Sequence, residues 1–306
     1  MPWDAEILSR IRHLHLRARV LTQGLLAGEH PSRSLGASVE FAEYQDYQRS
    51  MDPKWIDWAV WARTDRLVVK KFQAETRLTC VLVLDLSGDL GTGSEADRSL
   101  PDLEGSKAGY AITLAATLLY FFQRHGEAVG LEIVAGQGLT RTSWSARTGR
   151  RHLSHLFSAL AQVRPGGQAE LQRSLKAVGN RVHRRSWVGV ISDGMEEPEQ
   201  WLPTLGAFAR RRTDLRFIHL FDRREWRLPG EPCLYFSPEG GNALSVEPQS
   251  ARRAFAQVAT EYLGQVRAGV VSWGGQYHPT PTVLALDKVL SRVVLGLPLS
   301  VEEAWA

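Results

Sequence analysis

Acidic and hydroxyl side chains follow two apolar runs of the sequence. Asp85, Ser87 and Asp89 stand two residues apart at the end of one run, and Asp193 follows a second run that closes with Ser192. Mg²⁺ takes a few oxygen ligands from a protein and keeps several waters. Because such side chains at neighbouring strand ends can surround one ion, the pattern predicts a metal rim of Asp85, Ser87, Asp89 and Asp193, with Mg²⁺ as the cation.

A local role is the alternative for these acids. An aspartate after a strand often caps the next helix or turns the chain. That role would explain Asp193 alone as well as metal binding does. The presence of two such strand ends in one chain favours the metal rim.

The elements that must position these residues alternate between strands and helices. Apolar runs predict strands at 78–85, 128–135, 139–144, 186–192 and 214–221, with a further short strand at 232–236. Helical patterns occupy 106–124, 149–162, 168–179, 198–211 and 248–268. This alternation predicts an α/β fold with a doubly wound, mostly parallel sheet and helices on both faces. Ligands bind such sheets at the carboxyl ends of the strands, which is where the two acidic segments stand.

The region before the first strand has a different character. Residues 3–26 carry an amphipathic helix pattern. The sequence from 28 to 75 shows no regular pattern of apolar residues apart from that of a short helix. That helix carries Trp55, Trp58 and Trp61, whose spacing predicts a packing stripe; an aromatic stacking platform is the alternative. We therefore divide the chain into an N-terminal helical and irregular extension (1–76), the α/β domain (77–296) and a C-terminal tail (297–306).

Composition limits the class of protein. The 37 Lys and Arg against 33 Asp and Glu leave a net charge of +4, which does not require a nucleic-acid partner. Cys80 and Cys233 are far apart and suggest neither a disulfide framework nor a zinc site. Charges interrupt the N-terminal residues, and the longest apolar stretches fall short of a membrane span. We expect a cytoplasmic chain without membrane insertion.

Two sets of residues resemble known families. Asp85-x-Ser87-Gly88-Asp89, together with Ser192-Asp193-Gly194, resembles the metal-ion-dependent adhesion site of von Willebrand factor A domains. The upstream segment resembles the signature of a bacterial family of unknown function, often numbered fifty-eight, which pairs such a signature with a von Willebrand A-like domain. The upstream elements are Gly28-x-His30-x-Ser32, Glu40-Phe41, Tyr47, Ile56-Asp57-Trp58, Ala62-Arg63 and Leu67-Val68-Val69-Lys70. The resemblance extends from about residue 24 to 296.

This resemblance implies a non-enzymatic adaptor. Members of the family are expected to work beside a MoxR-type AAA+ ATPase and to present a client protein, here unknown, to it. In adhesion sites of this kind a carboxylate of the partner completes the coordination of the metal ion. The resemblance thus implies protein binding, with no catalytic residues.

Three positions depart from the pattern of the family. Asp89 replaces a serine of the adhesion motif, Gln168 replaces the threonine expected after Gly166-Gly167, and Ser50-Met51 replaces a Gly-Asp pair. The first two changes alter the ligands of the metal, whereas the fold and the partner do not depend on them.

Two other functions remain open. A phosphoaspartyl-type, Mg²⁺-dependent phosphohydrolase would use Asp85 as nucleophile, but Ser87 is unusual for that class and no lysine is evident near the later strand ends. A nucleic-acid-binding protein would use the arginine groups at Arg150-Arg151, His183-Arg184-Arg185 and Arg210-Arg211-Arg212. The same groups could instead meet an acidic surface of the ATPase, and we expect no nucleic-acid role.

Overall fold

The computed structural model describes most of the chain. The described residues are 14–23, 43–48, 56–71, 78–91, 106–140, 142–222, 233–235, 244–246 and 248–297. By its contacts the chain forms two units, one of residues 31–77 and one of residues 1–30 and 78–306. The segment 1–76 is therefore shared between the two units. Of the predicted tail, 297–306, only Leu297 is described.

In the part of the smaller unit that the structure describes, there are a short antiparallel pair and one helix. Its elements are β1 (Glu43–Asp46), β2 (Val68–Lys71) and α2 (Trp58–Thr64). Asp57 starts α2 as its N-cap, with its carboxylate accepting hydrogen bonds from the backbone N–H groups of Ala59 and Val60.

The tryptophan stripe is exposed where the structure describes it. Trp58 and Trp61 are 56% and 42% exposed, and their rings meet edge to face with centroids 6.0 Å apart. The two rings cover each other and not an apolar core, so the predicted packing stripe is wrong for these two residues. Trp55 lies outside the described residues.

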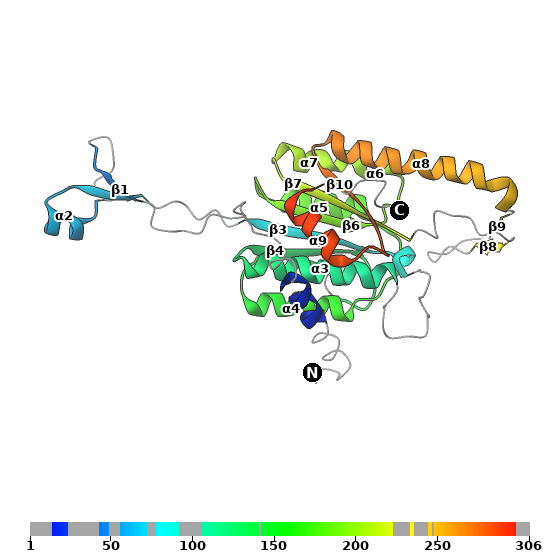
Figure 1. Cartoon of the computed structure of the whole chain (residues 1–306), viewed down its shortest axis with the longest axis horizontal. Coiled ribbons are helices and arrows are strands. Elements are labelled where there is room, and N and C mark those ends of the chain that lie inside the picture. Colours follow the sequence, from blue (N-terminus) through cyan, green and yellow to red (C-terminus); the bar gives the residue numbers. More distant parts are fainter. Residues whose placement is uncertain are drawn as a thin grey trace. The chain divides into compact units, whose positions relative to one another are not determined.

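The larger unit is built on a six-stranded sheet (Figure 1) with the order β10-β7-β6-β3-β4-β5. Its strands are β3 (Thr79–Leu86), β4 (Ala128–Ala135), β5 (Ser143–Arg147), β6 (Trp187–Ser192), β7 (Asp214–Phe221) and β10 (Gln276–Pro281). All neighbours are parallel except β5, which pairs antiparallel with β4. Because β3 lies between β4 and β6, the chain winds outward in both directions, which confirms the predicted mixed α/β fold with a mostly parallel sheet.

Helices cover both faces of this sheet. One face carries α3 (Lys107–Arg124), α4 (Arg150–Gln162) and α9 (Leu286–Leu295). The other carries α5 (Leu171–Arg181), α6 (Pro198–Trp201), η3 (Leu202–Leu205), α7 (Gly206–Arg210) and α8 (Pro248–Ser272). Figure 1 shows α3 and α4 on the side of the sheet opposite to α7 and α8. The remaining elements are η2 (Gly88–Gly91), β8 (Cys233–Tyr235) and β9 (Leu244–Val246), the last two forming a small antiparallel pair.

Successive side chains of a strand point to opposite faces of the sheet and so belong to two separate cores. Leu82 and Leu84 of β3 pack with α3 and α4, whereas Val83 packs with α5 and α8. The N-terminal helix, described over 14–23, joins the first core through the buried Ala18. Its His15 ring lies 5.3 Å from that of Tyr120 in α3, so the helix supports α3 from outside.

Some elements differ from the prediction. The edge strand lies at Ser143–Arg147, later than 139–144, and the helix expected at 198–211 is divided into α6, η3 and α7. The pattern of the sequence does not predict β10, because this strand contains Pro279 and Pro281. Proline is tolerated there because β10 is an edge strand. Among the described residues, no helix is both long and apolar enough to cross a membrane.

Candidate functional site

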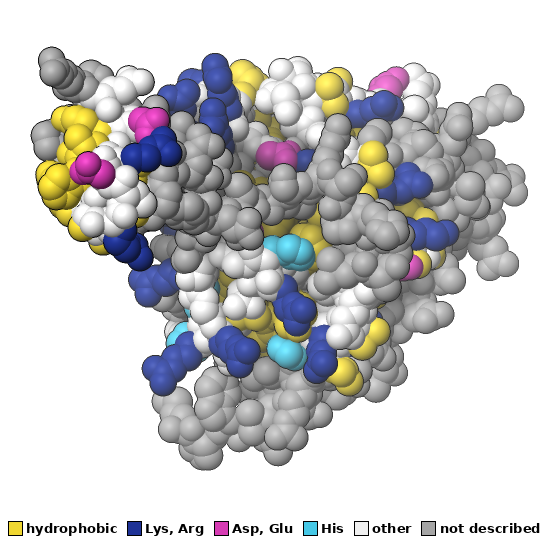
Figure 2. Space-filling view, turned by 60° about the vertical axis from the view of Figure 1, so that its left-hand side comes forward, with side chains coloured by type: hydrophobic (Ala, Val, Ile, Leu, Met, Phe, Trp, Pro, Cys, Tyr) yellow, Lys and Arg dark blue, Asp and Glu magenta, His cyan; other side chains and the backbone are white. Residues whose placement is uncertain are grey.

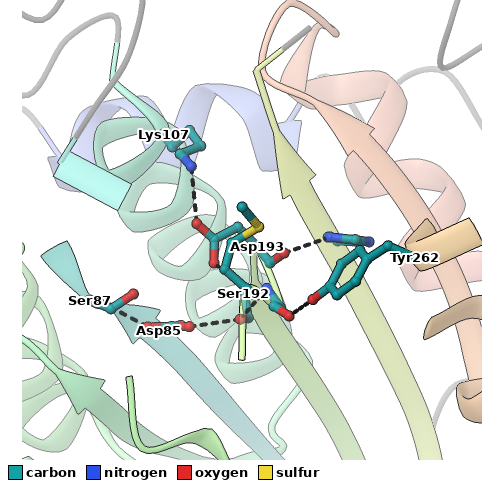
Figure 3. A network of polar contacts seen from close by, with 9 residues as sticks. Asp85, Ser87, Lys107, Ser192, Asp193 and Tyr262 are labelled. Carbon is teal, nitrogen blue, oxygen red and sulfur yellow. Dashed lines mark hydrogen bonds and ion pairs between the residues drawn. The ribbon is translucent and has the colours of Figure 1, made fainter. Parts of the chain in front are cut away.

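The two acidic segments meet at the carboxyl edge of the sheet. Leu84 of β3 stands beside Ile191 of β6, so Asp85 reaches Ser192. The Ser192 hydroxyl donates a hydrogen bond of 2.7 Å to Asp85 Oδ2, and the Ser87 backbone N–H donates one of 2.9 Å to Oδ1 (Figure 3). The strand order reverses at β3 and β6, and this reversal is where doubly wound sheets bind ligands.

Asp193, the next residue after β6, forms an ion pair with Lys107. The Nζ atom of Lys107 lies 3.0 Å from Asp193 Oδ2, and the two side chains are 2% and 4% exposed. In Figure 3 Lys107 extends from α3 toward Asp193. Lys107 is the first residue of α3, after Ser106, whose hydroxyl oxygen caps the helix by accepting from the Gly109 N–H.

Sequence reasoning missed Lys107 and expected no lysine near the site. The signal that could have found it is positional. In a parallel sheet the helix after a strand begins at the carboxyl edge, so the first residue of the helix after β3 stands beside the acids that follow β3 and β6.

A third loop joins the same edge. The Gly166 N–H donates to the Leu86 carbonyl at 2.9 Å, and the Gly88 N–H donates to the Gly167 carbonyl at 3.0 Å. Gly167 adopts a positive φ of 82°, which suits glycine. Gln168, the residue in place of the expected threonine, is exposed.

A histidine of β7, the strand next to β6, supports the site. The ring of His219, buried in β7, contacts the Asp193 carbonyl through Nε2 and the Tyr277 hydroxyl through Nδ1, both at 2.7 Å. Since a carbonyl only accepts, Nε2 carries the hydrogen and Nδ1 accepts from Tyr277. Tyr262 of α8 donates to the Gly194 carbonyl, so the loop after β6 is held from two elements (Figure 3).

Burial and charge shift the ionisation of these groups. Burial, followed by the charge of Asp193, raises the pKa of Asp85 to about 7, against the hydrogen bonds from Ser192 and Ser87. Burial and then Asp193 also raise the pKa of the half-buried Asp89, whereas the Lys107 charge lowers it. Burial lowers the pKa of His219 to about 4, so this ring is neutral at physiological pH.

The predicted metal rim is thus partly assembled. Asp85, Ser87 and Asp193 lie in one hydrogen-bonded network, and Asp89 lies on η2 within the electrostatic reach of Asp193 and Lys107. No group of three or more His, Cys, Asp or Glu side chains suited to a metal ion occurs in the part of the chain that the structure describes. The Lys107 ammonium holds an oxygen that a metal would need and repels a cation, so this donor set does not fit a divalent ion.

The arginine groups lie at the other edge of the sheet. His183-Arg184-Arg185 precedes β6 and Arg210-Arg211-Arg212 precedes β7, and the Arg185 N–H donates to the Arg211 carbonyl at 3.2 Å. Both groups therefore stand at the amino ends of the strands, away from Asp85 and Asp193. On the face shown in Figure 2, Lys and Arg side chains stand in several groups separated by other residues.

Comparisons with known proteins give relatives from mycobacteria. The chain is 29% identical over 269 residues to the uncharacterized protein Rv1480 of Mycobacterium tuberculosis, covering 86% of this chain and 81% of that protein. The uncharacterized protein Mb1516 of Mycobacterium bovis gives the same values.

Solved structures give weaker similarity. The conserved hypothetical protein BatB from Bacteroides thetaiotaomicron is 15% identical, with a TM-score of 0.43 over 72% of this chain and 98% of that one. An aerotolerance-related membrane protein from Bacteroides fragilis is 14% identical, with the same TM-score and coverage.

A family model gives the clearest result. The model described as Protein of unknown function DUF58 matches residues 43–263, which is more than two thirds of the chain and includes both acidic strand ends. The chain therefore belongs to the DUF58 family.

Proposed function

We propose that this chain is a non-enzymatic protein-binding adaptor whose larger unit is von Willebrand A-like. It docks its partner at the carboxyl edge of the sheet and works with a MoxR-type AAA+ ATPase, to which it presents a client protein. One observation carries the proposal: Asp85 and Asp193 meet at the reversal of strand order, in a network closed by Ser192 and Lys107. The antiparallel edge strand β5 beside β4 also supports a von Willebrand A-like arrangement.

The accessibility of the acids favours binding over catalysis. Asp85 is 1% exposed, and each of its carboxylate oxygens accepts a hydrogen bond. A nucleophile must come within about 3–3.5 Å of the atom that it attacks. A substrate atom could come this close to Asp85 only if the hydrogen bonds from Ser192 and Ser87 opened. A docking site needs no such access, because the partner contacts the surface around the buried acids.

The rim of the site has the character of a protein contact. Met195, two residues after Asp193, is 54% exposed next to the buried polar network. Methionine is enriched in protein interfaces because its flexible side chain adapts to a partner. Met195 is thus an exposed apolar residue in a loop that His219 and Tyr262 hold in place, which makes it a suitable anchor for a partner.

A binding experiment with a matched control tests the proposal. The full chain is mixed with the MoxR-type ATPase of the same organism, and complex formation is measured by calorimetry. Met195→Asp should weaken binding at least about tenfold, which corresponds to about 1.4 kcal/mol. Val271→Asp alters a residue that is equally exposed, at 54%, at the end of α8 near the opposite edge, and should bind normally. Absence of a complex, or equal affinity of all three proteins, would refute the proposal.

A phosphohydrolase is the second candidate, because Lys107 supplies a lysine beside the strand-end acids, where the sequence pattern indicated none. Release of phosphate from a generic phosphoester in the presence of Mg²⁺ would favour it, provided that Asp85→Asn abolishes the release. We expect no release above that of the variant.

A further inference from the structure

The acids at the sheet edge already have a cation of their own. We infer that the Lys107 ammonium group is the resident cation of this site, and that it holds the strand-end aspartates in place without a divalent metal. This inference concerns the unpartnered chain and stands independently of the proposed docking function.

Burial of the two aspartates favours the ion pair. Two aspartates, Asp85 and Asp193, are 1% and 3% exposed at adjacent strand ends. Bringing such carboxylates together away from water is unfavourable unless a positive charge or a proton compensates them; the raised pKa of Asp85 favours the proton there, and Asp193 takes the positive charge. Lys107 provides that charge at 3.0 Å from Asp193, and its field also reaches Asp89 on η2. The ammonium therefore stands where a cation among these acids is needed.

The helix itself does not explain a lysine at this position. Lys107 is the first residue of the 18-residue α3, where the helix dipole favours acidic side chains and disfavours cations. A surface lysine would also direct its charged end to water, whereas this side chain is 2% exposed. Its placement therefore follows from the acids and not from the helix.

The side-chain oxygens of Asp85 and Ser192 are engaged as well. The Asp85 carboxylate accepts from Ser192 and from the backbone of Ser87. The Ser192 hydroxyl oxygen in turn accepts from the Gly194 N–H at 2.9 Å. A divalent ion would have to displace these donors as well as the ammonium of Lys107.

Thermal unfolding of the full chain with and without divalent cations tests the inference. In the wild type, millimolar MgCl₂ or MnCl₂ should leave the melting temperature equal to that in EDTA. Lys107→Ser removes the charge and supplies an oxygen, so two buried carboxylates are left for a metal. This variant should melt lower than the wild type in EDTA, and its melting temperature should rise by about 5 °C or more once the cation concentration is about a hundred times its Kd.

Two further variants serve as controls. One tests whether the cation response is specific to the site of Lys107, and the other tests whether the charges of Lys107 and Asp193 depend on each other. Lys288→Ser removes an exposed lysine of α9 and should show no response to the cations. Lys107→Met combined with Asp193→Asn removes both charges and should melt higher than either single variant in EDTA.

The outcomes are decisive in either direction. A saturable rise of the wild-type melting temperature with Mg²⁺ or Mn²⁺ would overturn the inference, and this measurement stands even if Lys107→Ser does not fold. A folded Lys107→Ser protein without any cation response would overturn it as well. Since no partner is needed, failure of the binding experiment above leaves this result unaffected.

Discussion

Ser192 joins the ends of two strands by donating its hydroxyl hydrogen to Asp85 across 2.7 Å, although the two residues are 107 positions apart. The same hydroxyl oxygen accepts from the Gly194 N–H. One small side chain thus links the end of β3 to the loop that follows β6 and carries Asp193. The rigidity of the site depends on this link.

Replacing Ser192 by alanine should therefore destabilise the chain. The change leaves a buried carboxylate oxygen and a buried N–H without this partner, at a cost of about 1–3 kcal/mol in the free energy of unfolding. Urea unfolding measures the loss. Ser291→Ala, which removes a hydroxyl bonded to the Lys288 carbonyl on the exposed surface of α9, should change stability by less than about 0.5 kcal/mol. Equal losses in both variants would contradict the role assigned to Ser192.

Tyr262→Phe should loosen the loop after β6 without unfolding the domain. The variant loses the hydroxyl that donates to the Gly194 carbonyl, while the ring remains in place. We expect faster hydrogen exchange at Met195 and at Glu196, and a loss of about 1 kcal/mol in global stability. Thr260→Ala on the exposed face of the same helix is the control. Unchanged exchange at both amides would show that Tyr262 does not hold the loop.

His278 should make stability depend on pH. Burial, together with the charge of Arg216, lowers its pKa from 6.5 to about 4, and neither ring nitrogen has a hydrogen-bond partner. Between pH 6.5 and 4 the unfolded chain binds the proton more readily than the folded one, so stability falls as the pH falls through this window.

The variant His278→Leu isolates this contribution. The raised pKa of Asp85 acts in the opposite direction, but it is common to both proteins and cancels in their difference. The stability of the variant relative to the wild type should increase by up to about 3 kcal/mol between pH 7 and pH 4. Urea unfolding at a series of pH values measures it, and parallel profiles would refute the prediction.

The arginine groups at the amino edge should not make the chain a nucleic-acid-binding protein. Arg184, Arg185 and Arg212 are exposed, and cations near helix ends commonly satisfy backbone carbonyls, as Arg211 does toward the Ala207 carbonyl at the end of α7. Fluorescence anisotropy with a labelled duplex should give at most non-specific binding, with a Kd on the order of 10⁻⁴–10⁻⁶ M at physiological salt. Tighter binding that is lost on replacing these three residues by glutamate would reverse this conclusion.

The strands at the centre of the sheet are predictable because their environment is simple. A parallel strand buried on both faces reads as a continuous apolar run, and β3 and β6 were found within about a residue of their ends. The meeting of Asp85 with Asp193 follows from the rule that parallel strands end at one edge.

Lys107 and β10 were missed for different physical reasons. A lysine that starts a helix looks in sequence like any surface lysine, because its partner Asp193 is 86 positions away. The prolines of β10 weaken the strand pattern, and only the edge position of that strand makes them acceptable. The exposure of Trp58 and Trp61 depends on what α2 packs against, which periodicity does not encode.

The central position of β3 has a consequence for synthesis. Emerging from the ribosome first among the six strands, β3 meets β4 early, but its other neighbour, β6, follows only about a hundred residues later. Pairings so distant in sequence form slowly because a long loop must close first. Until then one edge of β3 is unpaired and Asp85 lacks Ser192, so the nascent chain passes through a stage in which it is prone to aggregation and has no assembled site.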